Sequence, residues 1–202
     1  GDVYKRQAYN YYVIMPANLK DTGKIIENLP NEKVYILDQV HEDLLDYPAV
    51  FQNFKEDIFS NLLKANEFIK KYEKLILVFT EDRQPQGMLE GFIAFCESKG
   101  FCFEIIDSLK SRGLQKGELY IIPEDKNLLR IIKMMKSSNL ELAKDLGIIS
   151  YNDTLLKEIV EGGITTISTD FRLMGAQLAE MLLNKEQKQI ANPNNLIIRN
   201  SV

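Results

Sequence analysis

The sequence is poor in the residues that build catalytic and metal centres. In 202 residues it has two cysteines, Cys96 and Cys102, and one histidine, His41. A structural zinc site takes four Cys or His ligands, so no metal site is expected. A disulfide between the two cysteines is possible by spacing, but no pattern supports it. Two partly buried free thiols in a reducing compartment are expected instead.

Net charge and long apolar runs are also lacking. The formal net charge is -4, and binding to phosphate backbones requires a basic face, so these residues are not expected to bind DNA themselves. No apolar run reaches the roughly 18 residues needed to span a bilayer. What the chain does have is a hydrophobic fraction of 45%. That is ample for a packed core in one medium domain or two small lobes.

The first seven residues are not expected to belong to the folded domain. The string "DVYKRQ", residues 2–7, is what the codons GAT GTG TAT AAG AGA CAG encode, and that DNA matches the transposase mosaic end of sequencing libraries. Residues 1–7 are therefore predicted to be a translated adapter scar, and the true N-terminus is expected to be lost. Raw reads that run from genuine upstream sequence into the hexapeptide would refute this hypothesis.

From residue 11 onward, short β-rich runs alternate with helical runs. This alternation predicts βα units and an α/β fold with mainly parallel sheets. A first series has strands at 11–17, 33–39 and 49–53 and helices at 19–30 and 54–72. A second series has strands at 74–80, 101–107, 119–123, 146–152 and 164–169, helices at 88–98, 124–138, 154–161 and 171–184, and a last strand within 192–201.

The two series divide near residues 70–74, a segment too short to be a free linker, so two lobes in contact are expected. The first series supplies only three strands, whereas a doubly wound lobe usually has about five or six. The first lobe is therefore predicted to be incomplete, having lost its opening βα units.

Polar side chains follow nearly every predicted strand, and ligands of open α/β sheets bind beyond the carboxyl ends of the strands. These residues are Pro16, Asn18, Asp38, Gln52, Asn53, Thr80, Glu81, Asp107, Glu124, Asp125, Asn152, Asp153, Thr169 and Asp170. Carboxylates accept hydrogen bonds from hydroxyl groups and amides both donate and accept, which suits a neutral polyhydroxylated ligand. Helix capping is the competing role for Asp153, Thr154 and Asp170, because N-caps stabilise a helix by about 1 kcal/mol.

No catalytic or phosphate-binding motif is present. The glycines of "EGGITTI" follow a helix and precede a strand, which is the place of a C-cap and turn and not of a phosphate loop. "GMLEG" lacks the GxGxxG spacing, and no GxxxxGK[ST], HExxH or GxSxG string occurs. The pair Glu124–Asp125 is typical of a helix start, and His41 is predicted to be an exposed loop residue. An enzyme is therefore not expected, and no cofactor is predicted.

The stretch from residue 147 to the end carries a resemblance. "GIISYND", "GITTISTDFRLMGAQLAEMLL" and "NPNNLIIRNSV" closely resemble the sensor domain of LacI/GalR-type regulators, which shares the type I periplasmic-binding-protein fold. The resemblance is weaker but in register over residues 11–144. "PANL", "YPAVFQNF" and "DLGIISYNDT" are similar to a bacterial subgroup in which this sensor follows a GntR-type winged-helix domain.

The resemblance implies two doubly wound Rossmann-like lobes that close on a sugar or sugar-derived effector. The first lobe would comprise residues 8–72 with a returning helix at 170–184, and the second residues 73–169 with a final strand at 194–202. The crossings would fall near residues 71–74, 168–170 and 184–192.

The resemblance, together with the strand ends, also gives a candidate ligand set. It consists of Asp38, Asn53, Glu81, Asp125, Asn152, Asp153 and Phe171, of which Phe171 would stack on a pyranose face. Sugar-sensing relatives carry an arginine three residues before a "GF" pair, but "MLEGF" has Met88 there, and Arg83 is out of register. That departure argues against ordinary free-hexose recognition.

The function expected from these features is the effector-binding and dimerisation domain of a cytoplasmic transcription regulator. Its partners would be a small-molecule effector, a second copy of the chain, and DNA only through a missing N-terminal domain, with no membrane contact. A periplasmic solute-binding protein of the same fold is the alternative. An α/β enzyme would need a nucleophile–base pair or a cofactor loop, and neither is present.

Overall fold

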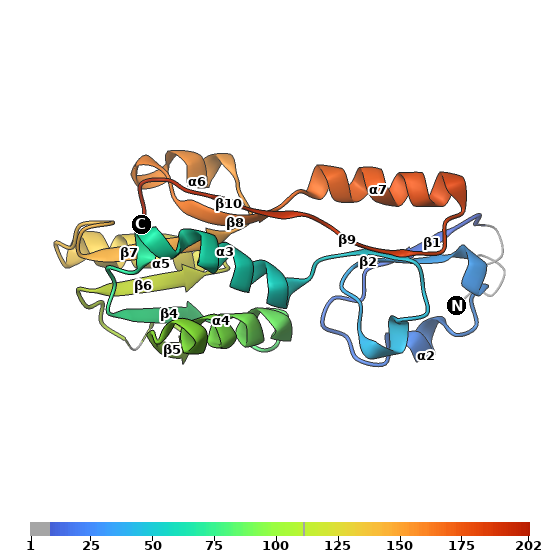
Figure 1. Ribbon diagram of the computed structural model, residues 1–202, viewed down its shortest axis with the longest axis horizontal. Coiled ribbons are helices and arrows are strands. Elements are labelled where there is room, and N and C mark those ends of the chain that lie inside the picture. The colour runs from blue at the N-terminus through green and yellow to red at the C-terminus, as the bar shows by residue number, and fades with distance from the viewer. Residues whose placement is uncertain (1–8, 111) are drawn as a thin grey trace. The chain divides into compact units, whose positions relative to one another are not determined.

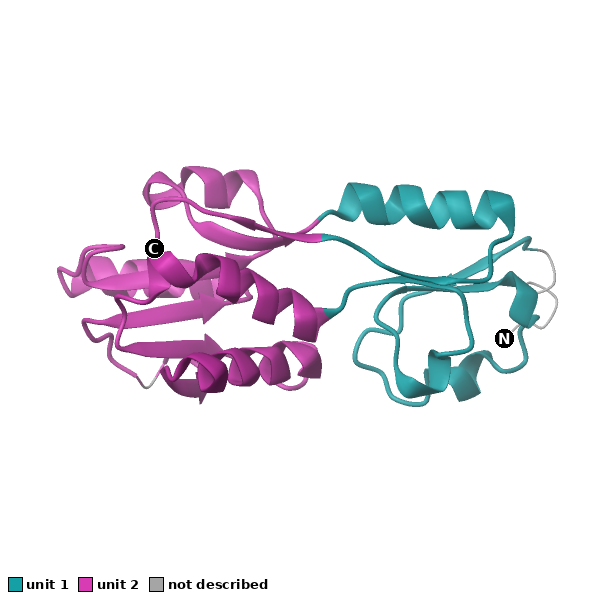
Figure 2. Cartoon of the chain, in the orientation of Figure 1, with its two compact units in different colours: residues 1–53, 170–193 teal, residues 54–169, 194–202 magenta. Residues whose placement is uncertain are grey.

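The computed structural model describes residues 9–110 and 112–202, so the predicted scar at residues 1–7 lies outside the described residues. The chain forms two compact units. Unit 1 comprises residues 1–53 and 170–193, and unit 2 comprises residues 54–169 and 194–202 (Figure 2). The chain therefore passes three times from one unit to the other, after Asn53, Thr169 and Pro193.

Unit 2 is built on a six-stranded sheet with the order β10-β8-β7-β6-β4-β5 (Figure 1). Its strands are β4 (Lys74–Val78), β5 (Cys102–Ile106), β6 (Glu118–Ile122), β7 (Leu146–Tyr151), β8 (Thr165–Thr169) and β10 (Asn194–Ile197). All neighbours are parallel except β10, which runs antiparallel to β8 with Leu196 opposite Ile167. The carboxyl ends of the five parallel strands thus lie along one side of the sheet, which we call the carboxyl edge of unit 2.

Helices cover both faces of this sheet. They are α3 (Phe54–Ile69), α4 (Gln86–Lys99), α5 (Asp125–Ser137) and α6 (Leu155–Ile159), followed by the 3-10 helix η3 (Val160–Gly162). Side chains of β4 alternate between the two faces: Leu75 and Leu77 pack with α3 and α4, whereas Ile76 and Val78 pack with α5. Central parallel strands buried on both faces read as continuous apolar runs, which explains "LILV" and "LYII".

Unit 1 has a smaller, all-parallel sheet with the order β1-β2-β3-β9. Its elements are β1 (Tyr12–Ile14), α2 (Thr22–Ile26), η1 (Asn31–Lys33), β2 (Val34–Asp38), η2 (Glu42–Leu44), β3 (Ala49–Phe51), α7 (Phe171–Asn184) and β9 (Gln189–Ala191). On one face Met174, Leu178 and Met181 of α7 pack against Tyr35 and Val50. The α/β class with parallel sheets is thus confirmed in each unit.

The predicted lobe boundary at residue 72 is wrong. Helix α3 belongs to unit 2, because its apolar side Ile58, Leu62 and Ile69 is buried in the same cluster as α4. The first crossing therefore lies after Asn53 and not at residues 71–74. The segment 184–192, predicted to cross, instead forms β9 beside β3, and the crossing comes only after Pro193.

Three smaller expectations also change. Cys96 is buried, but Cys102 is exposed, because it lies on the edge strand β5. His41 is half-buried and its Nε2 lies 2.6 Å from the carbonyl oxygen of Ala17. The helix predicted at 19–30 is confined to Thr22–Ile26, since Asp21 adopts a left-handed conformation with φ 60°.

Candidate functional site

Four of the predicted ligand residues lie along the carboxyl edge of unit 2. Glu81 follows β4, Asp125 follows β6, and Asn152 and Asp153 follow β7. Glu81 lies in an exposed turn. Lys157 contacts both Asp125 and Asn152, and Arg199 contacts Asp153. Neither basic residue was predicted to belong to the site.

Asn152 forms the tip of the edge. Its backbone is left-handed, with φ 59°, a conformation that asparagine tolerates better than most residues. Its N–H donates to the carbonyl of Ile167 at 2.8 Å, and its own carbonyl accepts from Lys157 Nζ at 2.8 Å. The backbone of Asn152 is thus held on both sides while its side chain is exposed.

Asp153 has a partner within unit 2. Arg199 donates to it through both terminal nitrogens, with Nη1 2.6 Å from Oδ1 and Nη2 2.8 Å from Oδ2, and Thr166 Oγ1 donates to Oδ1 at 3.2 Å. The hydrogen bonds from Arg199 hold the pKa of Asp153 below its usual range, although burial opposes the shift. This carboxylate therefore ties the C-terminal segment to β7 and β8; its contact with a ligand stays a prediction.

Asp125 is the first residue of α5 and is half exposed. Its Oδ1 lies 2.8 Å from Lys157 Nζ. Lys157 also donates to the carbonyls of Tyr151 and Asn152, and its side chain is only 2% exposed. No sequence pattern signals this arrangement, because a lysine within "TLLKEIVE" is normally on the solvated face of a helix.

Capping explains two residues of the edge. Thr154 is the N-cap of α6 and accepts from the N–H of Lys157 at 3.3 Å. Asp170 is the N-cap of α7 and accepts from the N–H of Leu173 at 2.8 Å. The capping role predicted for these two residues is confirmed, whereas Asp153 binds Arg199 instead.

The arginine expected three residues before the "GF" pair is replaced by a core residue. Met88 is 3% exposed and belongs to the cluster between the sheet and α3 and α4. Arg83 lies in the turn after β4, with Nη1 3.2 Å from Glu124 Oε2. Gln84 Nε2 donates to Oε1 of the same carboxylate at 3.0 Å. An exposed guanidinium therefore stands at the carboxyl edge, paired with Glu124.

Unit 1 holds the remaining predicted residues. Asp38 ends β2 in a left-handed conformation, with φ 81°, and its Oδ1 accepts from Gln52 Nε2 at 2.5 Å. Asn53 follows β3 and is exposed, and Phe171 begins α7 and is also exposed. The structure thus joins Asp38 to Gln52, whereas the grouping of Asn53 and Phe171 with Asp38 in one ligand site stays a prediction.

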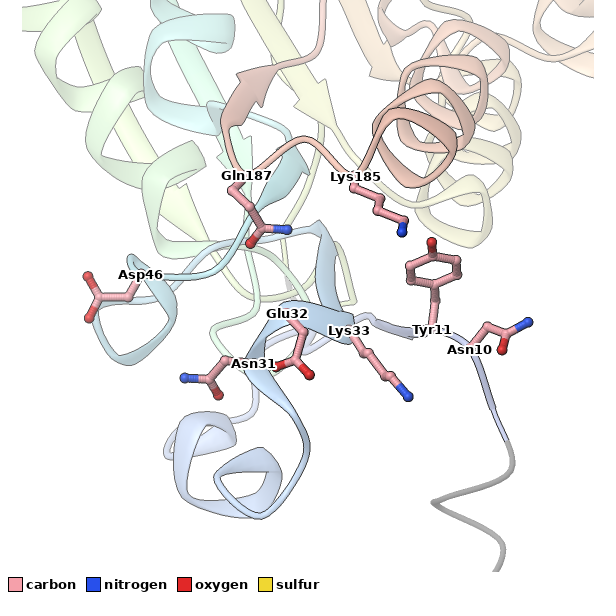
Figure 3. Close-up of a pocket in the computed structure, with 8 residues that line it drawn as sticks. All are labelled: Asn10, Tyr11, Asn31, Glu32, Lys33, Asp46, Lys185 and Gln187. Atoms are coloured by element: carbon pink, nitrogen blue, oxygen red, sulfur yellow. The ribbon is translucent and has the colours of Figure 1, made fainter.

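A pocket of about 720 Å³ lies at the amino ends of the strands of unit 1, whereas Asp38 and Asn53 follow the carboxyl ends. Most of its lining residues come just before strands β1, β2, β3 and β9 (Figure 3). They are Asn10, Tyr11, Asn31, Glu32, Lys33, Asp46, Lys185 and Gln187. Its lining includes two acidic and two basic residues, and none of the predicted ligand residues takes part.

Metal sites and membrane-spanning helices are both absent from the described part of the chain. Across residues 9–110 and 112–202, no group of three or more His, Cys, Asp or Glu side chains is arranged to hold a metal ion. No helix in that part of the chain combines the length and apolar character required to cross a membrane.

Comparison with known proteins agrees with this architecture. The profile of the periplasmic binding protein-like domain family matches residues 70–202, more than half of the chain. No curated protein matches the sequence.

Solved structures of regulators share the fold. A LacI family transcriptional regulator from Enterococcus faecalis V583 with bound ribose superposes with a TM-score of 0.76 at 19% identity, covering 98% of this chain and 79% of that one. The dimeric Lac repressor gives 0.77 at 14% identity, covering 97% and 78%. The complex of the transcriptional regulator CelR with cellobiose gives 0.75 at 13% identity, covering 97% and 67%. The chain therefore belongs to the family of periplasmic binding protein-like domains, and its fold is that of the LacI-type regulators.

Proposed function

We propose that this chain is the effector-binding domain of a cytoplasmic transcription regulator, and that its effector is a sugar or a sugar-derived metabolite. The chain would bind its ligand and not transform it. The observation that carries the proposal is the carboxyl edge of unit 2, where the exposed residue Asn152 and the half-exposed carboxylate of Asp125 are both held by Lys157. Amides and carboxylates of this kind are suited to ligand hydroxyl groups.

Two of the similar structures support the ligand class. One holds ribose and the other cellobiose, both neutral polyhydroxylated molecules. Because Met88 is buried where a ligand-binding arginine was expected, the effector need not be the sugar of either relative. We propose that the predicted set Asp38, Asn53, Glu81, Asp125, Asn152, Asp153 and Phe171 contains its contacts.

Calorimetric titration with a panel of sugars, sugar phosphates and sugar acids tests the proposal, with ribose and cellobiose included. Asn152→Gly is the informative variant, because glycine keeps the left-handed backbone and removes only the amide. Asn139→Gly is the matched control: Asn139 is also exposed and left-handed, with φ 52°, but it follows α5 at the amino side of the sheet. Asn152→Gly should weaken binding about tenfold, the value of one lost hydrogen bond, while Asn139→Gly leaves it unchanged. If no member of the panel binds, sensing of this ligand class is abandoned.

We further propose that the regulator combines this sensor with a GntR-type winged-helix domain, as the similarity of "YPAVFQNF" and "DLGIISYNDT" to that subgroup implies. The source gene upstream of Ala8 decides between this and the alternative. A winged-helix segment supports the regulator. A signal peptide without a DNA-binding domain would instead indicate a solute-binding protein.

We also propose that the domain forms a homodimer through α6. Leu155, Leu156 and Ile159 all lie on the exposed side of this helix, while Lys157 is buried. Clustered exposed apolar residues mark association surfaces, and a second copy of the chain is the occupant suggested by the dimeric Lac repressor. Sedimentation should detect a dimer that Ile159→Asp converts to a monomer. An unchanged chain that sediments as a monomer at all concentrations would refute this assembly.

A further inference from the structure

We infer that Lys157 is a positioning residue of the ligand site, an internal counter-ion that fixes Asp125 and Asn152 as one hydrogen-bonding edge for an uncharged ligand. The role of Lys157 in ligand binding rests on the proposed function. Its role in holding the turn at Asn152 can be measured without any ligand.

The first observation is the inverted pattern of α6. Its apolar residues Leu155 and Ile159 are each 76% exposed, whereas its lysine is 2% exposed. A long basic side chain normally extends into water, because burial of an ammonium is costly unless every N–H is satisfied. Burial of Lys157 on a helix whose leucine and isoleucine side chains are exposed therefore requires a specific set of acceptors.

Those acceptors match the three donors of an ammonium group. Lys157 Nζ donates to the carbonyl of Tyr151 and to the carbonyl of Asn152 at 2.8 Å, and it forms an ion pair with Asp125, with Oδ1 at 2.8 Å. An ammonium has three N–H donors and no acceptor, and three oxygens of the fold already surround this one. Lys157 therefore acts through the groups it holds.

The two carbonyls belong to the turn that carries the ligand residue. Their convergence on one ammonium fixes the peptide groups on both sides of Asn152, whose φ of 59° is a conformation that costs an asparagine free energy. The N–H groups of Asn152 and Asp153 are fixed in turn by Ile167 O and Ser168 Oγ, at 2.8 and 2.9 Å. The side-chain amide of Asn152 is therefore presented in one direction.

The third acceptor links this turn to a different strand end. The side chain of Asp125 is half exposed although its Oδ1 lies 2.8 Å from Lys157 Nζ, so the carboxylate is paired and remains accessible. The positive charge of Lys157 offsets the charge of Asp125, and Arg199 does the same for Asp153. An edge with paired charges and free acceptor positions fits the hydroxyl groups of an uncharged polyol better than a phosphate or carboxylate group.

Amide hydrogen exchange in Lys157→Met and Lys126→Met tests the positioning role. Lys126 is the neighbour of Asp125 and is exposed, so the control makes the same chemical change nearby. In Lys157→Met, exchange at Asn152 and Asp153 should accelerate about tenfold or more, because two carbonyls lose a buried donor, while the amide of Ile148, bound to Ser201 O, stays protected. Lys126→Met should change none of these rates.

Two outcomes would overturn the inference. Acceleration by the same factor at Asn152, Asp153 and Ile148 would make Lys157 an ordinary contributor to the stability of unit 2. Unchanged exchange at Asn152 would mean that the ammonium does not hold the turn. Asp125→Asn, which keeps the acceptor oxygen and removes the charge, should give an acceleration smaller than that of Lys157→Met.

Ligand titration with the panel named above then separates this inference from the proposed function. For a sugar that binds the unchanged chain, Lys157→Met should lower affinity at least tenfold, and Lys126→Met should not. Equal affinity in Lys157→Met would overturn the ligand role. If no sugar binds but exchange accelerates only at Asn152 and Asp153, the proposed function fails while the positioning role of Lys157 stands. A panel in which only sugar phosphates bind would overturn the uncharged ligand class.

Discussion

The two units use the same βα construction but cover their sheets to very different extents. In unit 2 every residue of β6 and β7 is buried, and apolar clusters fill both faces of the sheet. In unit 1 the central strands β2 and β3 are buried only in part, since Leu37, Asp38 and Phe51 at their carboxyl ends remain partly exposed. A sheet needs helices on both faces to bury central parallel strands, so unit 2 supplies the larger share of the hydrophobic stabilisation.

The same contrast extends to the polar edges. At the carboxyl edge of unit 2, Asp125 and Asp153 are each paired with a basic residue from a different segment. At the corresponding edge of unit 1, Asp38 accepts from the neutral side chain of Gln52. The well-covered unit thus holds charged groups in fixed ion pairs, as a rigid support for ligand residues requires.

The largest change in stability is expected from a matched pair of core truncations, Leu119→Ala in unit 2 and Leu44→Ala in unit 1. Both leucines are fully buried, and such truncations cost about 2–5 kcal/mol depending on how far the cavity collapses. We expect about 4 kcal/mol for Leu119, which lies in the large cluster between sheet and helices, and about 2 kcal/mol for Leu44 in the small cluster. Hydrogen exchange resolved by unit measures both values, and equal losses would contradict the contrast.

Gly91→Ala should be the next most damaging change. A Cβ at Gly91 would lie 2.2 Å from the carbonyl oxygen of Lys55 and 2.5 Å from Ile58 Cγ2, so α3 and α4 would have to move apart. Overpacking of this kind costs about 3 kcal/mol, and the loss should fall on unit 2. Denaturant titration with probes in each unit measures it. A variant as stable as the unchanged chain would mean that the two helices are not closely packed.

The elements with strong periodicity were predictable from the sequence. The helix predicted at residues 171–184 is α7, Phe171–Asn184, because the buried residues Met174, Leu178 and Met181 recur at helical spacing and Asp170 caps the start. Strand β9 was missed because its three residues carry no alternation of their own, and it exists only through pairing with β3. The unit to which α3 belongs was also hidden, since periodicity reveals an apolar face but not the sheet that it covers.

Only some residues of the candidate site could be predicted from the sequence. Strand ends can be located from sequence, so Asn152 and Asp125 were predictable as edge residues. Lys157 and Arg199 were not, because their roles depend on contacts made in three dimensions. Arg199 lies 46 positions from Asp153 in the chain, and Lys157 is buried against the expected polarity of its helix.

The buried carboxyl of Asp57 makes the free energy of unfolding of unit 2 depend on pH. Burial raises the pKa of this carboxyl to about 6, and no group of the described chain donates to its buried Oδ2. The folded pKa exceeds the unfolded value, so the protonated form is favoured in the fold. The stabilisation is complete below the unfolded pKa of about 4 and is lost as pH rises through 6.

Asp57→Asn removes this charge. Unit 2 should gain about 1 kcal/mol in free energy of unfolding at pH 8, less than the full linkage value because the group is partly solvated, and nothing at pH 3. Asp82→Asn, in the exposed turn after β4, is the control and should show no such pH dependence. Urea titrations at the two pH values measure the difference. A gain that is the same at both would show that the carboxyl of Asp57 titrates normally.

The smallest effect should come from Gly175→Ala, the unit 1 counterpart of Gly91→Ala. Both glycines lie inside helices, but a Cβ at Gly175 meets no atom within 4 Å, so no steric cost opposes the better helix propensity of alanine. The change should raise the stability of unit 1 by about 0.5–1 kcal/mol, because alanine loses less backbone entropy than glycine when the helix forms. Exchange at amides of α7 and β2 should slow several-fold, while exchange in β6 of unit 2 should not change. Opposite signs for the same substitution at Gly91 and Gly175 would show that close packing between helices, and not intrinsic propensity, distinguishes the two units.

A loss of stability in Gly175→Ala would mean that the open space beside α7 is occupied in solution. A second copy of the chain would be the first candidate, and sedimentation would detect it.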